Sequence, residues 1–293
     1  MAPTSRPFVV DPALTAIAIA YNNPAQSMIA DRVLPRQPVG QETFKWTEYP
    51  LVEGFTVPDT RVGRRGQVNQ VVFNGEERES AVEDFGLDAP VVMSDINAAA
   101  AARAAKRSTY DPEGHAAEAM TRLVELDREI RVAGVVQNPA NYAADRKVAL
   151  AGNEQLSDFV NSDPYGVLDE AIDGLLVYRA NTLVMGQPVW AKIKRHPRLI
   201  KAVKGGLSDE GAITKQQLAD LLEIREVIVG ESFVNTARPG QVAALNRVWG
   251  NFIAALYIDP AARPEGEMTW GITATFGTRI SGRIEDPNIG LEG

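Results

Sequence analysis

The chain has 293 residues, of which 45% are hydrophobic and 23% are charged, and its formal net charge is −8. This balance is typical of one large or two modest globular domains, and it excludes a fibrous repeat or a wholly disordered chain. There is no cysteine, which excludes disulfides and thiolate chemistry and fits a reducing cytoplasm. With His115 and His196 as the two histidines, zinc sites and histidine triads have little material, so we expect no metal and no cofactor.

The acidic balance argues against a protein whose main task is to grip phosphate backbones, so any contact with DNA is expected to be weak and non-specific. No apolar run approaches the roughly 20 residues that span a bilayer. Residues 13–20 superficially resemble the apolar core of a secretory signal, but Asp11 and Pro12 interrupt it. We expect an amphipathic helix there instead.

Residues 1–40 are predicted to form an N-terminal arm, because a short helix is followed by a proline-rich segment that favours extended backbone. Such an arm either moves freely or lies along a partner chain. Residues 43–49 and 67–73 are rich in aromatic and β-branched side chains, which predicts two strands. These strands bound an extended β-hairpin loop over residues 41–75, whose basic tip carries Arg61, Arg64 and Arg65.

An acidic run follows the predicted hairpin and consists of Glu76, Glu77, Glu79, Glu83, Asp84 and Asp88. Two carboxylates at a defined separation in a cleft carry out glycoside hydrolysis, so the run leaves open a cytoplasmic hydrolase. The alternative is a run of charges that faces solvent or a neighbouring subunit.

A long helix is predicted from Asp111, which is a favourable N-cap followed by Pro112 at the first helical position. Apolar residues recur at steps of three or four as far as residue 136, with Ile130 on the apolar stripe and Glu129 on another face. At 1.5 Å per residue this helix would be about 37 Å long. It would form the strut of a domain over residues 76–160.

Residues 161–258 alternate between helical and strand patterns, which indicates a compact α/β domain. The expected helices cover residues 164–178, 188–196, 198–204 and 215–222, and the expected strands cover residues 182–185, 226–229 and 252–258. Thr214 and Gln217 are expected to form a capping box for the fourth helix. The basic residues over 192–204 indicate either the outer side of two surface helices or a contact with DNA.

Residues 259–293 contain the clearest periodicity, because apolar side chains occupy even positions and polar ones odd positions from 269 to 284. Period two predicts a strand of about 50 Å, with Phe276 on its buried face and a bend at Gly277. We expect this strand to return to the sheet that includes the chain before the strut helix.

Motifs for other chemistry are absent from the sequence. Residues 63–66 and 230–234 lack the pattern of a nucleotide-binding loop and of a serine-hydrolase elbow, respectively. Trp46, Trp190, Trp249 and Trp270 are scattered one per element. This distribution favours anchors in cores or interfaces over a sugar-binding platform.

The order of parts is arm, long hairpin, strut helix, compact α/β domain and long strand, and it resembles the Hong Kong 97-type capsid fold of tailed bacteriophages. Blocks of sequence are similar to those of phage major capsid proteins, namely residues 61–64, 127–132, 161–164, 182–186, 229–231, 234–237, 247–250 and 286–291. The resemblance covers nearly the whole chain. It implies an α+β fold with an N-terminal arm, an extended loop, a peripheral domain with a spine helix, and an axial domain.

The resemblance also implies a structural protein, not an enzyme, which self-assembles as pentamers and hexamers into an icosahedral shell around phage DNA. Scaffold, portal and decoration proteins would be its other partners, with no membrane, and assembly in the bacterial cytoplasm would place it in the virion. Neither a cross-linking motif nor a large N-terminal scaffolding region is expected. A soluble oligomeric binding protein remains an alternative beside the hydrolase.

Contacts between subunits are predicted at the hairpin, where the basic tip of one copy would meet acidic groups of a neighbour. The predicted contact residues are Arg61, Arg64, Arg65, Glu76, Glu77, Glu79, Phe44 and Trp46. Exposed ion pairs contribute only about 0–1 kcal/mol each. Such pairs would therefore fix the register of neighbours more than they add affinity.

Overall fold

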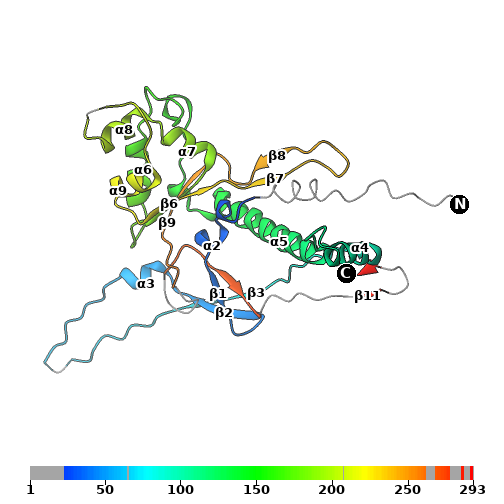
Figure 1. The fold of residues 1–293 in the computed structure, drawn as a ribbon. Helices are drawn as coiled ribbons and strands as arrows, with labels where there is room; N and C mark the ends of the chain where they lie inside the picture. Colours follow the sequence, from blue (N-terminus) through cyan, green and yellow to red (C-terminus); the bar gives the residue numbers. More distant parts are fainter. Residues whose placement is uncertain are drawn as a thin grey trace. The chain divides into compact units, whose positions relative to one another are not determined.

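The computed structural model describes residues 23–64, 66–206, 208–261, 268–277, 285–286 and 291–292. The chain divides into two compact units, one formed by residues 1–34, 85–258 and 280–293 and the other by residues 35–84 and 259–279. Figure 1 labels the elements of both. The helix expected within residues 13–20 lies outside the described residues. Among the described helices, none combines the length and the apolar character needed to cross a membrane.

A three-stranded sheet with the order β6–β5–β9 is the centre of the first unit. Its middle strand β5 (Thr182–Gly186) is parallel to β6 (Glu226–Gly230) and antiparallel to β9 (Ile253–Leu256). Every residue of β5 is buried, as expected for a strand that is covered on both faces. The face of the sheet that carries Leu183 and Met185 packs against the helices α6 (Pro164–Asp173), α7 (Gln187–Ile193), α8 (Pro197–Val203) and α9 (Lys215–Leu221).

Apolar side chains from these helices and strands form one core cluster, in which Leu168, Leu183 and Leu199 are almost completely buried. Burial of a side chain of this size contributes about 1.5–3 kcal/mol. The predicted capping box is confirmed, because the Gln217 N–H donates to Thr214 Oγ1 at 3.1 Å and the Thr214 N–H donates to Gln217 Oε1 at 2.9 Å. The helices and strands predicted here are confirmed, although α6 ends at residue 173 instead of 178.

The long helix predicted in the first unit is α5 (Pro112–Gln137), which Figure 1 shows in green. The predicted N-cap is confirmed, because Asp111 directly precedes the helix and Pro112 is its first residue. The Asp111 carboxylate pairs with Arg103 at 2.7 Å, and this bond is the main cause of its lowered pKa. The predicted stripe is wrong at its centre, because Glu129 is fully buried whereas Ile130 is 39% exposed. The buried face instead follows residues 129, 132, 133 and 136, which recur at helical spacing.

Shorter elements complete the first unit. Before α5 lie a 3₁₀ helix η1 (Ala25–Ser27), α2 (Ala30–Val33), β4 (Val91–Val92) and α4 (Met93–Ala104). After α5 come three 3₁₀ turns, η2 (Pro139–Asn141), η3 (Ala144–Arg146) and η4 (Gly152–Glu154). β7 (Phe233–Asn235) and β8 (Leu245–Arg247) form an antiparallel hairpin, and β11 (Glu285–Asp286), β12 (Leu291–Glu292) and β4 form an antiparallel sheet in that order.

The second unit contains an antiparallel ribbon of β2 (Thr43–Glu48) and β3 (Glu76–Ala81). The first predicted strand of the hairpin is confirmed, but the second is wrong, because residues 67–73 lie outside any strand and the start of the acidic run pairs instead. Lysine and arginine side chains on the ribbon face its carboxylates, so cross-strand ion pairs replace the apolar pairs that we expected. A short helix, α3 (Leu51–Phe55), follows β2.

A parallel pair, β1 (Arg36–Pro38) and β10 (Thr273–Thr275), completes the second unit. The predicted arm therefore has a partner within the chain at residues 36–38. The long strand expected over residues 269–284 is wrong in its described part, because β10 is short and Phe276 is 51% exposed. Gly277 has a φ of 75°, which breaks the extended backbone after β10. Residues 278–284 lie outside the described part of the chain.

Candidate assembly surfaces

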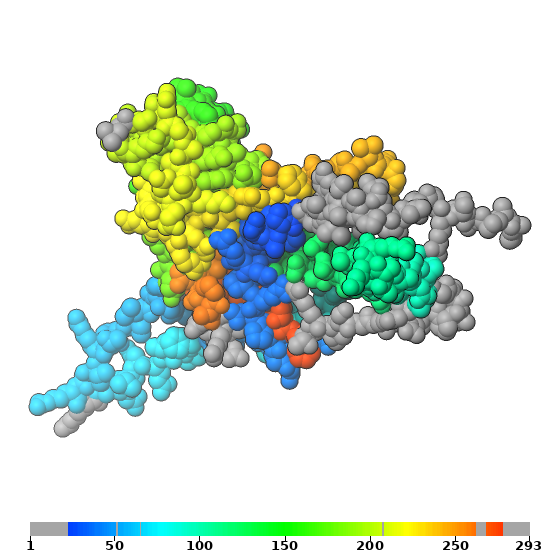
Figure 2. All heavy atoms as spheres, viewed as in Figure 1, coloured from blue at the N-terminus to red at the C-terminus, as the bar shows by residue number. Residues whose placement is uncertain are grey.

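The connection between β2 and β3, residues 49–75, exposes most of the apolar side chains that the structure describes there. Exposed fractions of 63–84% are found for Val52, Phe55, Val57, Val68, Val72 and Phe73. Figure 2 shows this segment of the second unit in cyan as a thin strip of atoms. A two-stranded ribbon is marginally stable in water by itself, and clustered exposed apolar residues mark sites of protein contact.

Hydrogen bonds within this connection hold its limbs together. The Gly66 N–H donates to the Gly63 carbonyl at 2.9 Å, which places a turn where the basic tip was predicted. Arg61 and Arg64 are exposed there, and Arg65 lies outside the described residues. Nearer the ribbon, the backbone N–H of residue 74 donates to the Glu53 carboxylate at 2.8 Å. The loop is thus internally connected although its side chains face solvent.

The predicted acidic contact residues Glu76, Glu77 and Glu79 lie on β3 and are exposed. Cations of the same ribbon already face them: Lys45 Nζ is 2.8 Å from Glu77, and the guanidinium of Arg78 is 3.2 Å from Glu76 and 2.9 Å from Glu48. The hydrogen bond to Glu77 is the main cause of the raised pKa of Lys45. Four carboxylates share two cations on the ribbon, so it keeps a net negative charge. Exposed, paired carboxylates lack the burial that tunes a catalytic acid.

The predicted aromatic contact residues Phe44 and Trp46 lie two positions apart on β2, so their side chains share one face of the ribbon. Their ring centroids are 5.8 Å apart, and Trp46 is 37% exposed while Phe44 is partly buried. Trp46 lies opposite Arg78 in the register. Residues directly opposite one another share a face, so Arg78 lies on the same face of the ribbon as the two aromatic side chains.

A buried carboxylate that sequence reasoning missed organises the first unit. Glu129 on α5 accepts hydrogen bonds from the backbone N–H of Ile29 at 2.8 Å and of Ala30 at 2.8 Å. It also accepts from Trp249 Nε1 at 2.6 Å and from Ser232 Oγ at 3.4 Å. Among the described residues no cation pairs with it, so these donors alone stabilise its charge. Its spacing from Val132 and Val136 was the signal that could have revealed it.

This carboxylate holds residues 29–34 on their own subunit. Ile29 and Val33 are at most 1% exposed within their own subunit, so the prediction of an arm that moves freely or lies along a partner chain is wrong over this stretch. Arg128, next to Glu129, pairs with Asp31 and donates to the Leu34 carbonyl at 3.0 Å. Arg128 and Glu129, which are adjacent on α5, therefore both hold residues 29–34 in place.

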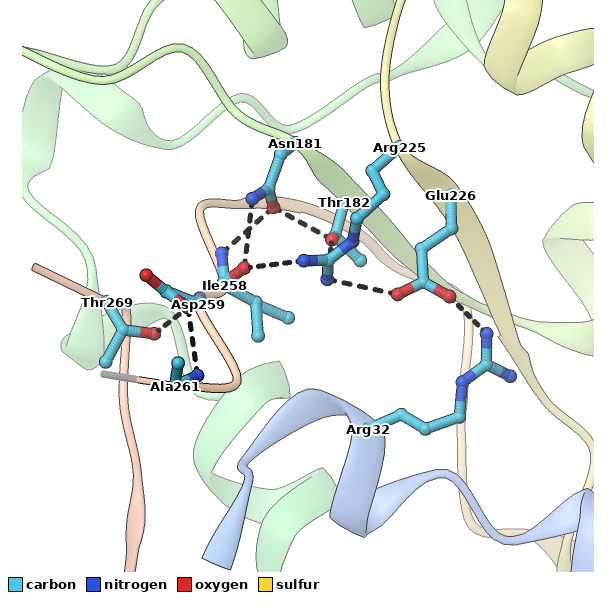
Figure 3. A network of polar contacts seen from close by, with 9 residues as sticks. All are labelled: Arg32, Asn181, Thr182, Arg225, Glu226, Ile258, Asp259, Ala261 and Thr269. Carbon is cyan, nitrogen blue, oxygen red and sulfur yellow. Dashed lines mark hydrogen bonds and ion pairs between the residues drawn. The ribbon is translucent and has the colours of Figure 1, made fainter. Parts of the chain in front are cut away.

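A polar network at the ends of the central sheet fixes α2 from its other side (Figure 3). Arg32 on α2 pairs with Glu226 on β6 at 2.5 Å, and Glu226 also pairs with Arg225 at 3.1 Å. Arg225 donates to the Ile258 carbonyl at 3.0 Å, and Asn181 both donates to that carbonyl and accepts from the Ile258 N–H at 2.9 Å. The segment after β9 and the N-terminal segment are thus held to one sheet.

The basic residues over 192–204 lie on or next to α7 and α8. Ile193 and Leu199 are fully buried in the core cluster, whereas Lys192, Arg195 and Lys201 are exposed. His196 is also fully buried, and its Nε2 lies 3.0 Å from Ser162 Oγ. In the part of the chain that the structure describes, no cluster of histidine and carboxylate side chains could hold a metal ion.

The exposed loop and the buried network around Glu129 are features of a structural protein, and the comparisons with known proteins point to the same kind of role. No protein-family model matches the chain. The chain is 45% identical over 290 residues to a major capsid protein of Pseudomonas phage JBD67, which covers 99% of this chain and 90% of the relative. This chain belongs to the phage major capsid proteins. Its role is structural, as the subunit of a capsid.

Two further likenesses are more distant. A major capsid protein of Burkholderia phage BcepMu is 29% identical over 256 residues, which cover 85% of this chain and 76% of that protein. A solved structure of a phage-related protein from Bordetella bronchiseptica RB50 superposes with a TM-score of 0.67 at 23% identity, covering 97% of this chain and 90% of the other. The hydrolase and the soluble binding protein gain no support from these relatives.

Proposed function

We propose that this capsid protein has the Hong Kong 97-type fold and assembles as pentamers and hexamers into an icosahedral shell around phage DNA. Within that fold, α5 serves as the spine helix of a peripheral domain over residues 76–160, and the central sheet with α6–α9 belongs to an axial domain over residues 161–258. Residues 1–40 supply the arm, residues 41–75 the extended loop, and residues 259–293 the returning segment. The likeness to a solved phage-related protein supports the fold.

The observation that carries this proposal is the exposed connection between β2 and β3. A monomer gains nothing from a long loop whose apolar side chains meet water, because hydration of each such side chain is unfavourable. Neighbouring copies in a closed, symmetric assembly cover such a segment in every subunit. The loop therefore acts as the element that reaches across to a neighbour.

Charges on the second unit give this contact its register. We assign Arg61, Arg64 and Arg65 to the acidic surface of a neighbouring copy, and Phe44 and Trp46 to the same interface. The ribbon carries a surplus of carboxylates after its own ion pairs are counted, which supplies an acceptor for those cations. The role requires no catalytic group. The net charge of −8 is consistent with a shell whose inner surface contacts the packaged DNA only weakly and non-specifically.

Other partners follow from the same role. Scaffold, portal and decoration proteins would bind the shell, and assembly would take place in the cytoplasm of the bacterial host before the protein resides in the virion. These assignments rest on membership of the capsid family.

A loop excision tests the proposal directly. Residues 50–74 would be replaced by an Asn-Gly turn, which suits a two-residue hairpin and leaves β2 and β3 in place. We expect a folded subunit that no longer forms shells in sedimentation velocity and negative-stain microscopy, whereas the unmodified chain does. Shells of normal size from the shortened chain would contradict the role given to the loop.

A further inference from the structure

The turn between α6 and β5 has a strained backbone. Val177 has a φ of 72°, and the Tyr178 N–H donates to the Leu176 carbonyl at 2.8 Å. A hydrogen bond across two residues with positive φ at the central one defines the rare, strained form of the γ-turn. For a β-branched residue this conformation is a true outlier, because the side chain clashes with its own backbone.

Both flanks of the turn hold it in this conformation. On one flank, Arg146 donates to the Gly174 carbonyl. On the other, Arg179 pairs with Asp173 at 2.6 Å and donates to the Glu223 carbonyl at 3.1 Å. The ring of Tyr178 also lies 4.7 Å from that of Tyr257. Strain of this kind persists only where surrounding contacts over-determine the backbone.

The strained turn presents apolar side chains to solvent. Leu175 packs against the core cluster, but Leu176 is 62% exposed and Val177 is 52% exposed. The free subunit thus bears two costs at one place, namely backbone strain and exposure of aliphatic surface. The contacts on both flanks keep the backbone in this form, but Leu176 and Val177 stay exposed, and a rigid, pre-ordered apolar knob is the form that a repeated protein contact favours.

We propose that Leu176 and Val177 make a fixed contact with a second copy of this chain. The inference rests on the proposed function, since every subunit of a capsid is surrounded by further copies of itself, and it adds a contact in the first unit to the loop of the second. Because the turn is braced, each copy presents the knob with the same geometry, as a symmetric assembly requires.

Val177→Gly separates this role from a role in folding. Glycine adopts positive φ without strain, so the urea midpoint of the isolated subunit should equal or exceed that of the wild type. Loss of the side chain should raise the protein concentration needed for assembly about tenfold, as for removal of one well-covered interface residue. Leu176→Ser, which leaves the backbone unchanged, should impair assembly to a similar degree.

Val148→Ser is the matched control, because Val148 is 79% exposed and its backbone is not in the left-handed region. It should assemble like the wild type. Wild-type assembly by both turn variants, an equal loss in the control, or a lower urea midpoint that accounts for the assembly defect would each overturn the contact. If the wild-type chain itself formed no shells while staying folded, the proposed function would fail, and this contact with it.

Discussion

Replacing the buried carboxylate of Glu129 by an amide tests the internal support of the first unit. Both carboxylate oxygens accept hydrogen bonds: one from Trp249 Nε1 at 2.6 Å and from the Ile29 N–H, the other from the Ala30 N–H at 2.8 Å. In Glu129→Gln one of these positions becomes an NH₂ group. That group meets a buried donor, so either the indole or the Ala30 amide loses its acceptor.

The magnitude follows from these contacts. A hydrogen bond to a charged group contributes about 1.5–3 kcal/mol, and a buried donor left without an acceptor costs about 1–3 kcal/mol. Removal of a buried charge returns part of its desolvation cost. We therefore expect Glu129→Gln to lower the free energy of unfolding by about 2–4 kcal/mol.

Urea unfolding of the unassembled subunit measures this change, and amide hydrogen exchange locates it. Exchange at Ile29 and Ala30 should become faster, because both amides donate to the replaced group. The control is Glu118→Gln, which breaks an exposed pair with Arg122 on the same helix and should cost about 0.5 kcal/mol or less. Equal effects of the two substitutions, or unchanged exchange at residues 29 and 30, would refute the reasoning.

Three further predictions concern other parts of the chain. Burial lowers the pKa of His196, so the unfolded chain, with a histidine pKa of about 6.5, binds the proton more readily; stability should fall as pH decreases below about 6.5, and His196→Gln should flatten the urea midpoint against pH. Thr214→Ala removes a capping box and should cost about 1 kcal/mol in thermal unfolding, and a change below about 0.3 kcal/mol would contradict the cap. Reversal of Arg61 and Arg64 to Glu should leave the subunit folded but impair assembly, and normal shells at physiological salt would show that these charges are only solvated.

The central sheet and its helices were predictable because their signals are local. The strand over residues 182–186 contains the apolar run Leu183–Met185, and the helix from residue 215 has its own capping box. Such patterns depend on neighbours a few residues away. Elements with such patterns can therefore be predicted without knowledge of the tertiary contacts.

The predictions of burial and of strand pairing were wrong where contacts between residues far apart in the sequence determine the structure. The helical spacing of Glu129 with Val132 and Val136 indicates its face of α5 but not its partners. Its donors come from Ile29, Ala30 and Trp249, about a hundred residues away. Residues 67–73 have strand-like composition, but Val72 and Phe73 are exposed. The strand that pairs with β2 is instead formed by residues 76–81, at the start of the acidic run. The composition of a segment indicates a preference for strand, but whether it forms one depends on the chain segment with which it pairs.

Electron cryo-microscopy of the purified chain under assembling conditions tests the central claim most directly. The account predicts closed icosahedral shells in which residues 49–75 of each subunit lie against a neighbouring copy and their apolar side chains are covered. Shells that leave this segment in solvent, or a folded chain that stays monomeric at micromolar concentration under all salt conditions, would contradict it.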